Sequence, residues 1–378
     1  MKTEANKMTK QPSYRFAGFE DAWKEVKLGD FVEISKGIQR NKEFLSPNAD
    51  NKNCYPVYNG GKQESGYTDE FNREGNIMIS EGGASAGFVN YFNGKYWSGG
   101  HNFTIDELEN DIYYVLALLE SQQQELYSLQ VGSGLPNIQL NSLKKVIIAF
   151  PSFLEQQAIG SFFQDIDQLI SLQQRKLEVL KEQKKTYLKL LFPAKGQAKP
   201  ALRFAGFEDE WKEVKLGEVT DIKTGGRDVQ NSVEDGLYPF YIRSEEVKRI
   251  NSYSFDGEAI LIPGEGRLGE IFHYANGKFD VHQRVYKISN FTDVNAKFVL
   301  QQMKKDFKQH AMRNTVKATV DSLRLPTIQS FNILVPSLPE QTAIGSFFQD
   351  LDKAIAKQEE KINQLKESKQ TFLKEMFI

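Results

Sequence analysis

Cysteine is nearly absent from this 378-residue sequence, with Cys54 as the single example. One cysteine cannot form an intrachain disulfide framework or a cysteine-only zinc cluster. The four histidines are far apart in the sequence and do not supply the ligand spacing of a structural zinc site. Long hydrophobic runs are also missing: no stretch of ~18 apolar residues occurs, and the N-terminal MKTEANKMTK has no apolar core. We therefore expect no membrane span, no signal peptide and a cytoplasmic location.

Neither sign of charge is in excess, since 48 basic and 50 acidic residues leave a net charge of −2. This balance carries no global signature of nucleic-acid binding. The distribution is uneven, because residues 30–150 carry about −6 whereas residues 218–335 are slightly positive. Any nucleic-acid contact would therefore depend on local basic loops or on the surface of a partner. The length and the ordinary Gly and Pro content predict about two globular domains.

Catalytic motifs are lacking as well. Gly264, Gly266 and Gly269 match the dinucleotide-binding fingerprint, but the next residues read as a strand and a turn, where the fingerprint requires a helix. The sequence contains no G-K-[ST], H-E-x-x-H or G-x-S-x-G motif. It has no Pro-Pro pair, which excludes the Asn/Asp-Pro-Pro-aromatic loop of amino-methyltransferases. We therefore expect a non-catalytic protein.

What the sequence does contain is an internal repeat. The segment RFAGFEDAWKEVKLGD at 15–30 recurs at 203–218 with 14 of 16 positions identical, and EQQAIGSFFQDID at 155–167 recurs at 340–352. The chain therefore reads as two tandem units of about 185 residues, related by a pseudo-two-fold axis. The edges of the units are nearly identical and their interiors have diverged. We interpret the edges as a shared scaffold or partner surface and the interiors as two different readers; recent duplication followed by drift is the alternative.

Each interior reads as a mixed α+β domain. Short alternating runs at 76–80 and 259–263 predict strands, and Asn-Gly pairs at Asn59, Asn93 and Asn276 predict hairpin turns. Helices are expected at 112–128 and 296–313. Each unit then closes with a long helix, from about Glu155 to Phe192 and from about Glu340 onward, and a short polar linker at 194–201 joins the halves.

Both closing helices carry apolar residues at alternating steps of four and three, the heptad pattern of a coiled coil. The seam residues are Ile159, Phe163, Ile166, Ile170, Gln173, Leu177, Leu180, Ile344, Phe348, Leu351, Ile355, Gln358, Ile362 and Leu365. We expect the two helices to pack as an antiparallel pair; separate amphipathic helices lying on their own domains are the alternative. The register that keeps seam lysines at the helix ends places Lys184 beside Ile344 and Lys369 beside Ile159.

Polar and basic residues around flexible glycines are the candidate ligand contacts. Arg and Lys can pair with guanine, and Asn and Gln with adenine, while Lys and backbone amides hold phosphates. The alternative for each candidate is that it lies in an exposed, solvated loop with no ligand. For the isolated histidines, contact with a ligand is favoured over a catalytic role. The candidates are Lys36, Gln39, Arg40, Asn59, Lys62, Gly83, Ser85, His101 and Asn102 in the first half, and Arg227, Arg243, Ser244, Arg267, His282, Gln283, Arg284, Arg313 and Lys317 in the second. Arg267 and Arg284 are the strongest candidates for ligand contact in the second half.

The doubled pattern P-x-x-R-F-x-G-F, W-x-x-x-x-L-G, a variable interior and E-Q-x-x-I followed by a long helix resembles the specificity subunit of type I restriction-modification systems. The matching segments are 12–29, 151–159, 200–217 and 336–344. One departure is that Phe153-Leu154 stands where the second copy has Leu338-Pro339. The resemblance extends over essentially the whole chain after the first ten residues.

This resemblance implies two target recognition domains, each reading half of a bipartite DNA sequence, spaced by an antiparallel coiled coil. It implies a non-catalytic subunit that recruits two methyltransferase subunits and, with restriction subunits, completes an ATP-dependent nuclease. S-adenosylmethionine, ATP and Mg would belong to those partners. The alternative is a non-catalytic coiled-coil scaffold that binds protein or glycan. The expected divisions are a disordered N-terminus 1–11, a first recognition domain 12–152, a first helix 153–193, the linker 194–201, a second recognition domain 202–337 and a second helix 338–378.

Overall fold

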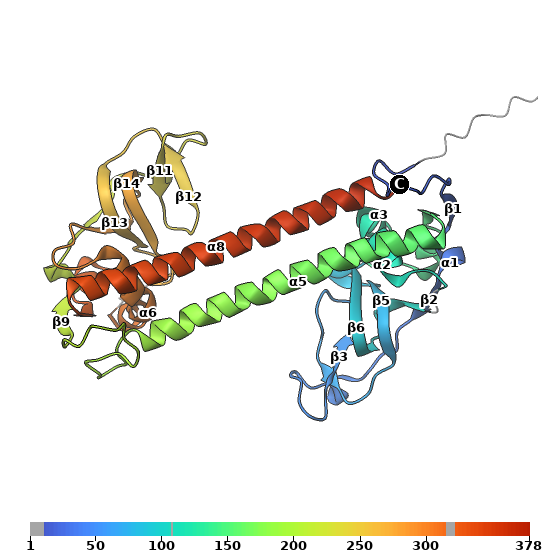
Figure 1. The fold of residues 1–378 in the computed structure, drawn as a ribbon, viewed down its shortest axis with the longest axis horizontal. Coiled ribbons are helices and arrows are strands. Elements are labelled where there is room, and N and C mark those ends of the chain that lie inside the picture. Colours follow the sequence, from blue (N-terminus) through green and yellow to red (C-terminus); the bar gives the residue numbers. More distant parts are fainter. Residues whose placement is uncertain (1–10, 107–108, 315–321) are drawn as a thin grey trace, which may run out of the picture. The chain divides into compact units, whose positions relative to one another are not determined.

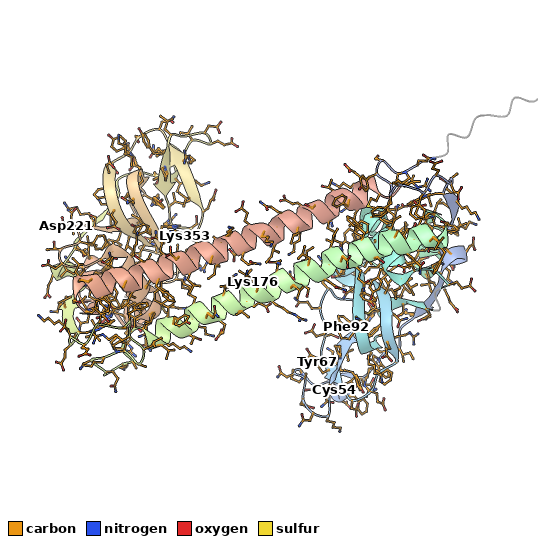
Figure 2. All side chains as sticks on the ribbon, in the orientation of Figure 1. Cys54, Tyr67, Phe92, Lys176, Asp221 and Lys353 are labelled. Atoms are coloured by element: carbon orange, nitrogen blue, oxygen red, sulfur yellow. The ribbon has the colours of Figure 1, made fainter. Side chains whose placement is uncertain are left out.

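The computed structural model describes residues 11–106, 109–314 and 322–378. Nearly all of the N-terminal segment expected to be disordered, and the candidate contact Lys317, lie outside these residues. The chain divides into two compact units. The first contains the chain up to Gln174 together with Glu360–Ile378, and the second contains Arg175–Glu359. Cys54 is exposed in the first unit (Figure 2).

Each unit holds a six-stranded sheet, and the two sheets have one topology. In the first unit the strand order is β2 (Glu33–Lys36), β7 (Asn102–Asp106), β5 (Arg73–Ser80), β6 (Val89–Ser98), β3 (Tyr55–Tyr58) and β4 (Tyr67–Thr68). In the second it is β10 (Asp221–Thr224), β15 (Val285–Ser289), β13 (Phe255–Pro263), β14 (His273–Val281), β11 (Tyr238–Tyr241) and β12 (Val247–Ile250). The pairs β3–β6 and β11–β14 are parallel, and the other described pairs are antiparallel. The diverged interiors therefore keep the same scaffold.

Smaller elements complete each unit. A two-stranded sheet joins β1 (Lys24–Lys27) to β8 (Ile147–Phe150), and another joins β9 (Lys212–Lys215) to β16 (Asn332–Val335). The helices of the first unit are α1 (Leu28–Phe31), α2 (Ile112–Ser121), α3 (Gln123–Ser128) and α4 (Leu140–Leu143), with short 3-10 turns at Lys42–Phe44 and Gly83–Ser85. The second has α6 (Ala296–Asn314) and α7 (Leu325–Gln329), with 3-10 turns at Leu216–Glu218 and Val229–Asn231. Figure 1 shows α2 beside β5 and β6. The helices expected at 112–128 and 296–313 are present, the first divided at Gln122.

Two of the three predicted hairpin turns are wrong. Asn93-Gly94 lies inside β6 and Asn276-Gly277 lies inside β14. Gly277 pairs with Gly257 on β13, and both have positive φ (111° and 146°). These glycines let two long paired strands bend in mid-course, which is a second use of the residues that favour tight turns.

The near-identical edges of the two halves contribute buried residues to both cores. Trp23 and Trp211 are buried in equivalent places. Glu155, 1% exposed, accepts bonds from Nε (2.6 Å) and Nη2 (2.7 Å) of Arg15; Glu340, 0% exposed, accepts the same pair of bonds from Arg203 at 2.7 Å each. This pair ties the opening turn of each half to its long helix. Part of the sequence identity at the edges is therefore required by packing.

One glycine on each long helix allows the helix to lie close against a helix cap of its own domain. Asp111 accepts a bond from Tyr114 N (2.8 Å) and caps α2. A Cβ at Gly160 would collide with that cap, and a Cβ at Gly345 would lie 2.9 Å from Asn295 Oδ1, which accepts from Phe298 N in α6. The repeated A-I-G-S segment is thus the place where each long helix touches a helix cap of its own domain.

The long helices are α5 (Phe153–Leu190) and α8 (Leu338–Glu375), and each contributes to both units. The core of the first unit includes Met376 and Phe377, just past the end of α8, and the core of the second includes Leu191 and Phe192, just past the end of α5. In each unit a phenylalanine ring packs edge-to-face against a tryptophan: Phe377 against Trp23 (6.2 Å between centroids) and Phe192 against Trp211 (6.1 Å). Each unit is therefore completed by the end of the helix that follows the other domain. Among the described residues, no helix is both long and apolar enough to cross a membrane.

Within each unit the two helix segments run antiparallel, as predicted. In the first unit Phe162 meets Phe372 (5.0 Å) and Asp167 meets Lys369; in the second Lys184 meets Asp352 and Tyr187 meets Phe347 (5.1 Å). The seam residues are buried or half-buried.

The predicted register is wrong by roughly one heptad. Lys369 lies beside Asp167 rather than Ile159, and Lys184 contacts Asp352 rather than Ile344. Lys369 is 8% exposed, and its Nζ lies 2.8 Å from Asp167 and 2.6 Å from Glu120 of α2. Burial opposes its charge, but these carboxylates raise the pKa of Lys369 above its ordinary value. The prediction failed because a seam lysine was assumed to need water, whereas the neighbouring domain supplies acidic partners.

Candidate nucleic-acid interface

Backbone hydrogen bonds identify equivalent loop positions in the two domains. In the first unit Glu81 N donates to His101 O (2.8 Å) and Ile138 N donates to Glu81 O (2.8 Å). In the second unit Gly264 N donates to Arg284 O (2.8 Å) and Leu323 N donates to Gly264 O (2.8 Å). His101 thus occupies the place of Arg284, and the turn after β5 occupies the place of the turn after β13. Both domains gather their candidate residues around this point.

The first cluster is centred on Glu81. Its carboxylate lies 2.6 Å from Lys36 Nζ at the end of β2 and 3.8 Å from His101 Nδ1. Asn59, following β3, accepts a bond from His101 N (3.2 Å). A cavity of about 520 Å³ opens here, and its lining is formed by Asn59, Glu81, Gly82, Gly83, His101, Leu135, Pro136 and Asn137. Four distant segments of the chain therefore form one concavity beside a carboxylate, and Leu135 in its lining is exposed.

Other first-domain candidates have internal partners. Arg40 is covered by Trp97 (4.5 Å to the ring centroid) and pairs with Asp69 (2.8 Å) and Glu70 (2.9 Å). Asn102 is 2% exposed and donates to Tyr58 O (2.6 Å), so it holds the strands together and presents no surface to a ligand. Gln39 Nε2 donates to Arg40 O, Lys62 lies over the Phe88 ring, and Gly83 and Ser85 bound a 3-10 turn.

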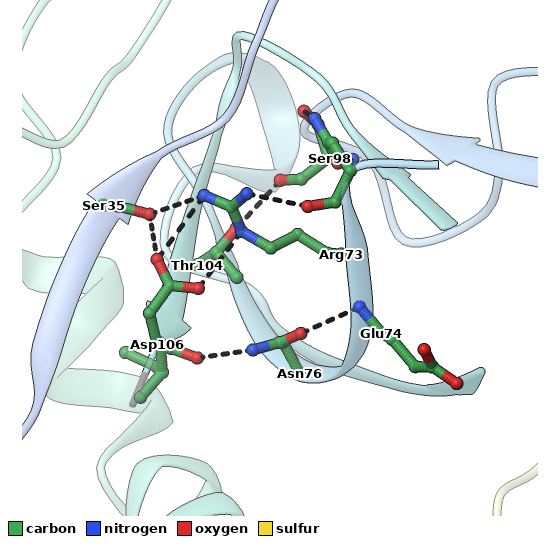
Figure 3. A network of polar contacts seen from close by, with 9 residues as sticks. Ser35, Arg73, Glu74, Asn76, Ser98, Thr104 and Asp106 are labelled. Atoms are coloured by element: carbon green, nitrogen blue, oxygen red, sulfur yellow. Dashed lines mark hydrogen bonds and ion pairs between the residues drawn. The ribbon is translucent and has the colours of Figure 1, made fainter. Parts of the chain in front are cut away.

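A polar network missed by the sequence analysis orders the first sheet (Figure 3). Arg73 on β5 donates from Nη2 to Ser35 Oγ (2.9 Å) on β2, and its Nε lies 3.1 Å from Asp106 Oδ1 on β7. Ser35 also donates to Asp106, and Asn76 Nδ2 donates to Ile105 O (3.1 Å). These bonds link strands that are not all neighbours, so the network fixes the sheet that carries the loops. Nothing in the local sequence pattern pairs these residues.

The second cluster is centred on Glu265. Arg243, following β11, donates from Nη1 to Glu265 Oε2 (3.2 Å), and Arg284, preceding β15, donates from Nη1 to Glu265 Oε1. These two guanidinium groups lower the pKa of Glu265. His282 beside them is 2% exposed, and its Nδ1 accepts a bond from Arg284 N (3.0 Å). Burial lowers the pKa of His282, so the imidazole supports the loop rather than presenting itself to a ligand.

Most of the remaining second-domain candidates have carboxylate or backbone partners. Arg267 donates to Glu270 (2.9 Å) and Glu245 (2.8 Å), and Glu270 also pairs with Lys308 (2.6 Å). These cations lower the pKa of Glu270 to about 2. The other contacts are Arg227 with the buried Asp280, Gln283 with Asp228, and Ser244 Oγ with Glu246 O, while Arg313 lies in the last turn of α6.

The sequence analysis singled out the basic residues of this site and missed the acidic ones. Glu81 and Glu265 each stand beside glycines directly after a buried strand, in the segments Glu81-Gly82-Gly83 and Gly264-Glu265-Gly266. That placement was the available signal, since a carboxylate at such a strand end meets residues from the adjoining loops. The geometry offers guanidinium, ammonium and amide groups on exposed loops, which can donate to base edges and phosphates.

The comparisons with known proteins agree on one family. The sequence profile described as type I restriction modification DNA specificity domain matches residues 20–182 and again 208–367. A Mycoplasma pneumoniae protein assigned as a type I specificity subunit is 25% identical over 370 residues, covering 94% of this chain and 96% of that protein. The specificity subunit of the type I restriction enzyme MjaVIII of Methanocaldococcus jannaschii is 23% identical over 395 residues, covering 93% and 91%.

A solved structure has the same fold. The crystal structure of a type I restriction-modification S subunit from M. genitalium superposes with a TM-score of 0.74 at 22% identity, covering 98% of this chain and 99% of that one. The doubled profile match, the doubled sheet topology and the long helix after each domain lead to the same assignment. The chain belongs to the type I restriction-modification DNA specificity family.

Proposed function

We propose that this chain recognises a bipartite DNA target, with one domain for each half-site, and recruits methyltransferase and restriction subunits to it. The observation that carries the proposal is one sheet topology built twice with different residues at equivalent loop positions. Lys36 and His101 surround a carboxylate in the first domain, and Arg243 and Arg284 surround one in the second. Equal scaffolds with unequal loops suit the reading of two different short sequences.

The recruitment of two identical partners is supported by exposed residues that are the same in both repeated edges although packing does not require them. Lys24 and Glu25 of β1 are exposed, and so are their counterparts Lys212 and Glu213 of β9. Two equivalent exposed surfaces suit two copies of one partner. The partners would bring S-adenosylmethionine, ATP and Mg²⁺, and this chain would act without catalysis, in the cytoplasm where its DNA lies. Partner surfaces would also add to the DNA clamp, which fits the net charge of −2.

The test is co-expression of the full chain with a methyltransferase subunit of a type I system from the same genome. The complex should co-purify, and mapping of methylated bases should give one two-part motif with a fixed spacer. Methylation of a single uninterrupted motif would contradict the division of labour between the domains. Complex formation without any DNA binding would favour the alternative, a scaffold for protein or glycan.

A further inference from the structure

The arrangement of Arg243, Glu265 and Arg284 has a consequence for what the second domain reads. The three residues come from separate segments: after β11, after β13 and before β15. Glu265 is the least exposed of them, with 23% of its side chain accessible, against 47% for Arg243 and 55% for Arg284. The carboxylate therefore lies beneath two exposed guanidinium groups and holds both.

The bonds leave one edge of each guanidinium available. Both arginines bind Glu265 through Nη1, and among the described residues neither Nε nor Nη2 of either arginine has a bonding partner. Arg267 differs, because its Nε binds Glu270 and its Nη1 binds Glu245. Two parallel N–H groups on one guanidinium edge match O6 and N7 of guanine. Arg243 and Arg284 can present that edge while they stay bound to the carboxylate, whereas both ends of the Arg267 guanidinium are occupied.

Arg284 is also fixed at its backbone. Its N donates to the buried His282 Nδ1 (3.0 Å), and its O accepts from Gly264 N (2.8 Å). A long side chain held at both the main chain and the guanidinium loses little further freedom when it binds. At the equivalent point of the first domain, the residues that the structure describes form no such arginine pair, and Lys36 and His101 contact Glu81 instead. An ammonium group is a point charge without the two-pronged geometry.

We propose that Glu265 is a positioning residue that presents Arg243 and Arg284 to guanine in the DNA half-site read by the second domain. The inference rests on the proposed function and adds the base class to it. Glu265 makes no bond to DNA itself. It sets which edge of each arginine faces outward, so its loss should affect the choice of base rather than the strength of binding to all sequences.

The experiment is selection of DNA from a random double-stranded library by the full chain with its methyltransferase subunit. The variants are Glu265→Gln and the matched control Glu270→Gln; each removes one negative charge from the segment that joins β13 to β14. Glu265→Gln should lower the preference for guanine at one or more positions of one half-site by about tenfold, the scale of one bidentate contact. Binding to all sequences should stay equal or rise, because a negative charge has gone. Glu270→Gln should keep the parent's preference.

Arg243→Lys with Arg284→Lys provides a second, independent arm. It keeps the charge and removes the guanidinium edge, so it should lose guanine preference as Glu265→Gln does, at an unfolding midpoint close to the parent's. An unchanged preference in Glu265→Gln, an equal loss in Glu270→Gln, or a half-site without a G·C pair would overturn the inference and leave the proposed function standing. A parent complex with no sequence preference at all would overturn both.

Discussion

At the residue scale, the Arg15–Glu155 pair shows how a charged side chain becomes part of a core. Glu155 is 1% exposed and accepts two bonds from one guanidinium. Arg15→Leu leaves that carboxylate buried without its partner and should lower the free energy of unfolding by about 3–5 kcal/mol. Urea unfolding measures the loss. The double variant Arg15→Leu/Glu155→Leu should recover much of it, because no buried charge remains; a double variant as unstable as the single one would contradict this account.

His282 should make the stability of the second unit depend on pH. Its pKa lies below the ordinary 6.5, first because it is buried and then because Arg243 and Arg284 lie nearby. Below pH 6.5 the unfolded chain takes up a proton that the folded chain does not yet bind. The stabilising contribution is therefore complete above pH 6.5 and is lost as pH falls from there through the lower folded pKa.

Thermal unfolding of the parent and of His282→Gln between pH 8 and pH 5 tests this. The parent should lose more of its midpoint on acidification than the variant does. Parallel curves for the parent and His282→Gln would remove His282 as the cause.

At the element scale, each long helix ends in the core of the domain that it does not follow. Phe377 packs on Trp23, Tyr114 and Phe163 in the first unit, and Phe192 packs on Trp211, Phe298 and Phe348 in the second. Phe377→Ala should cost about 3–5 kcal/mol through the cavity that it leaves.

Hydrogen exchange should show where that loss falls. In Phe377→Ala, strands β5 and β7 should lose protection while β13 and β15 keep theirs, and Phe192→Ala should give the opposite pattern. Equal loss in both units for either variant would mean that the helix ends do not stabilise the units separately.

How far the elements could be predicted depended on whether the deciding contacts were local. The 3.5-residue repeat on the two closing helices indicated an antiparallel pair, and each unit shows it. The register depended on Glu120, a residue of α2 that no heptad count includes. The hairpin turns predicted at two Asn-Gly pairs were wrong for a similar reason. Gly94 and Gly277 lie inside strands that continue because each pairs with a long neighbouring strand, and that pairing is not visible in the local sequence. In the loops, residue type alone predicted the basic candidate residues. Their acidic partners, Glu81 and Glu265, come from distant segments of the chain, so the sequence pattern did not indicate them.

At the scale of the whole molecule, the repeated topology predicts that each of the two recognition domains can be exchanged without the other. A chimera with a foreign sequence at residues 30–150 should change one half of the methylated motif and leave the other half and the spacer as they were. The reason is that the loops of each domain are bonded to their own sheet. Motif mapping of the chimera's complex measures it, with a chimera at 218–335 as the reciprocal case. A change in both halves, or in neither, would count against modular reading.

The exchange of helix ends between the two units also sets an order of events during synthesis. Residues 175–359 form one unit, so the second unit has all of its parts once residue 359 is made. The first unit starts earlier but needs Glu360–Ile378, which leave the ribosome after everything else in it. The Trp23 side chain therefore lacks its contact with Phe377 until the entire second unit has been synthesised. The domain that is translated first is the one that can finish folding last.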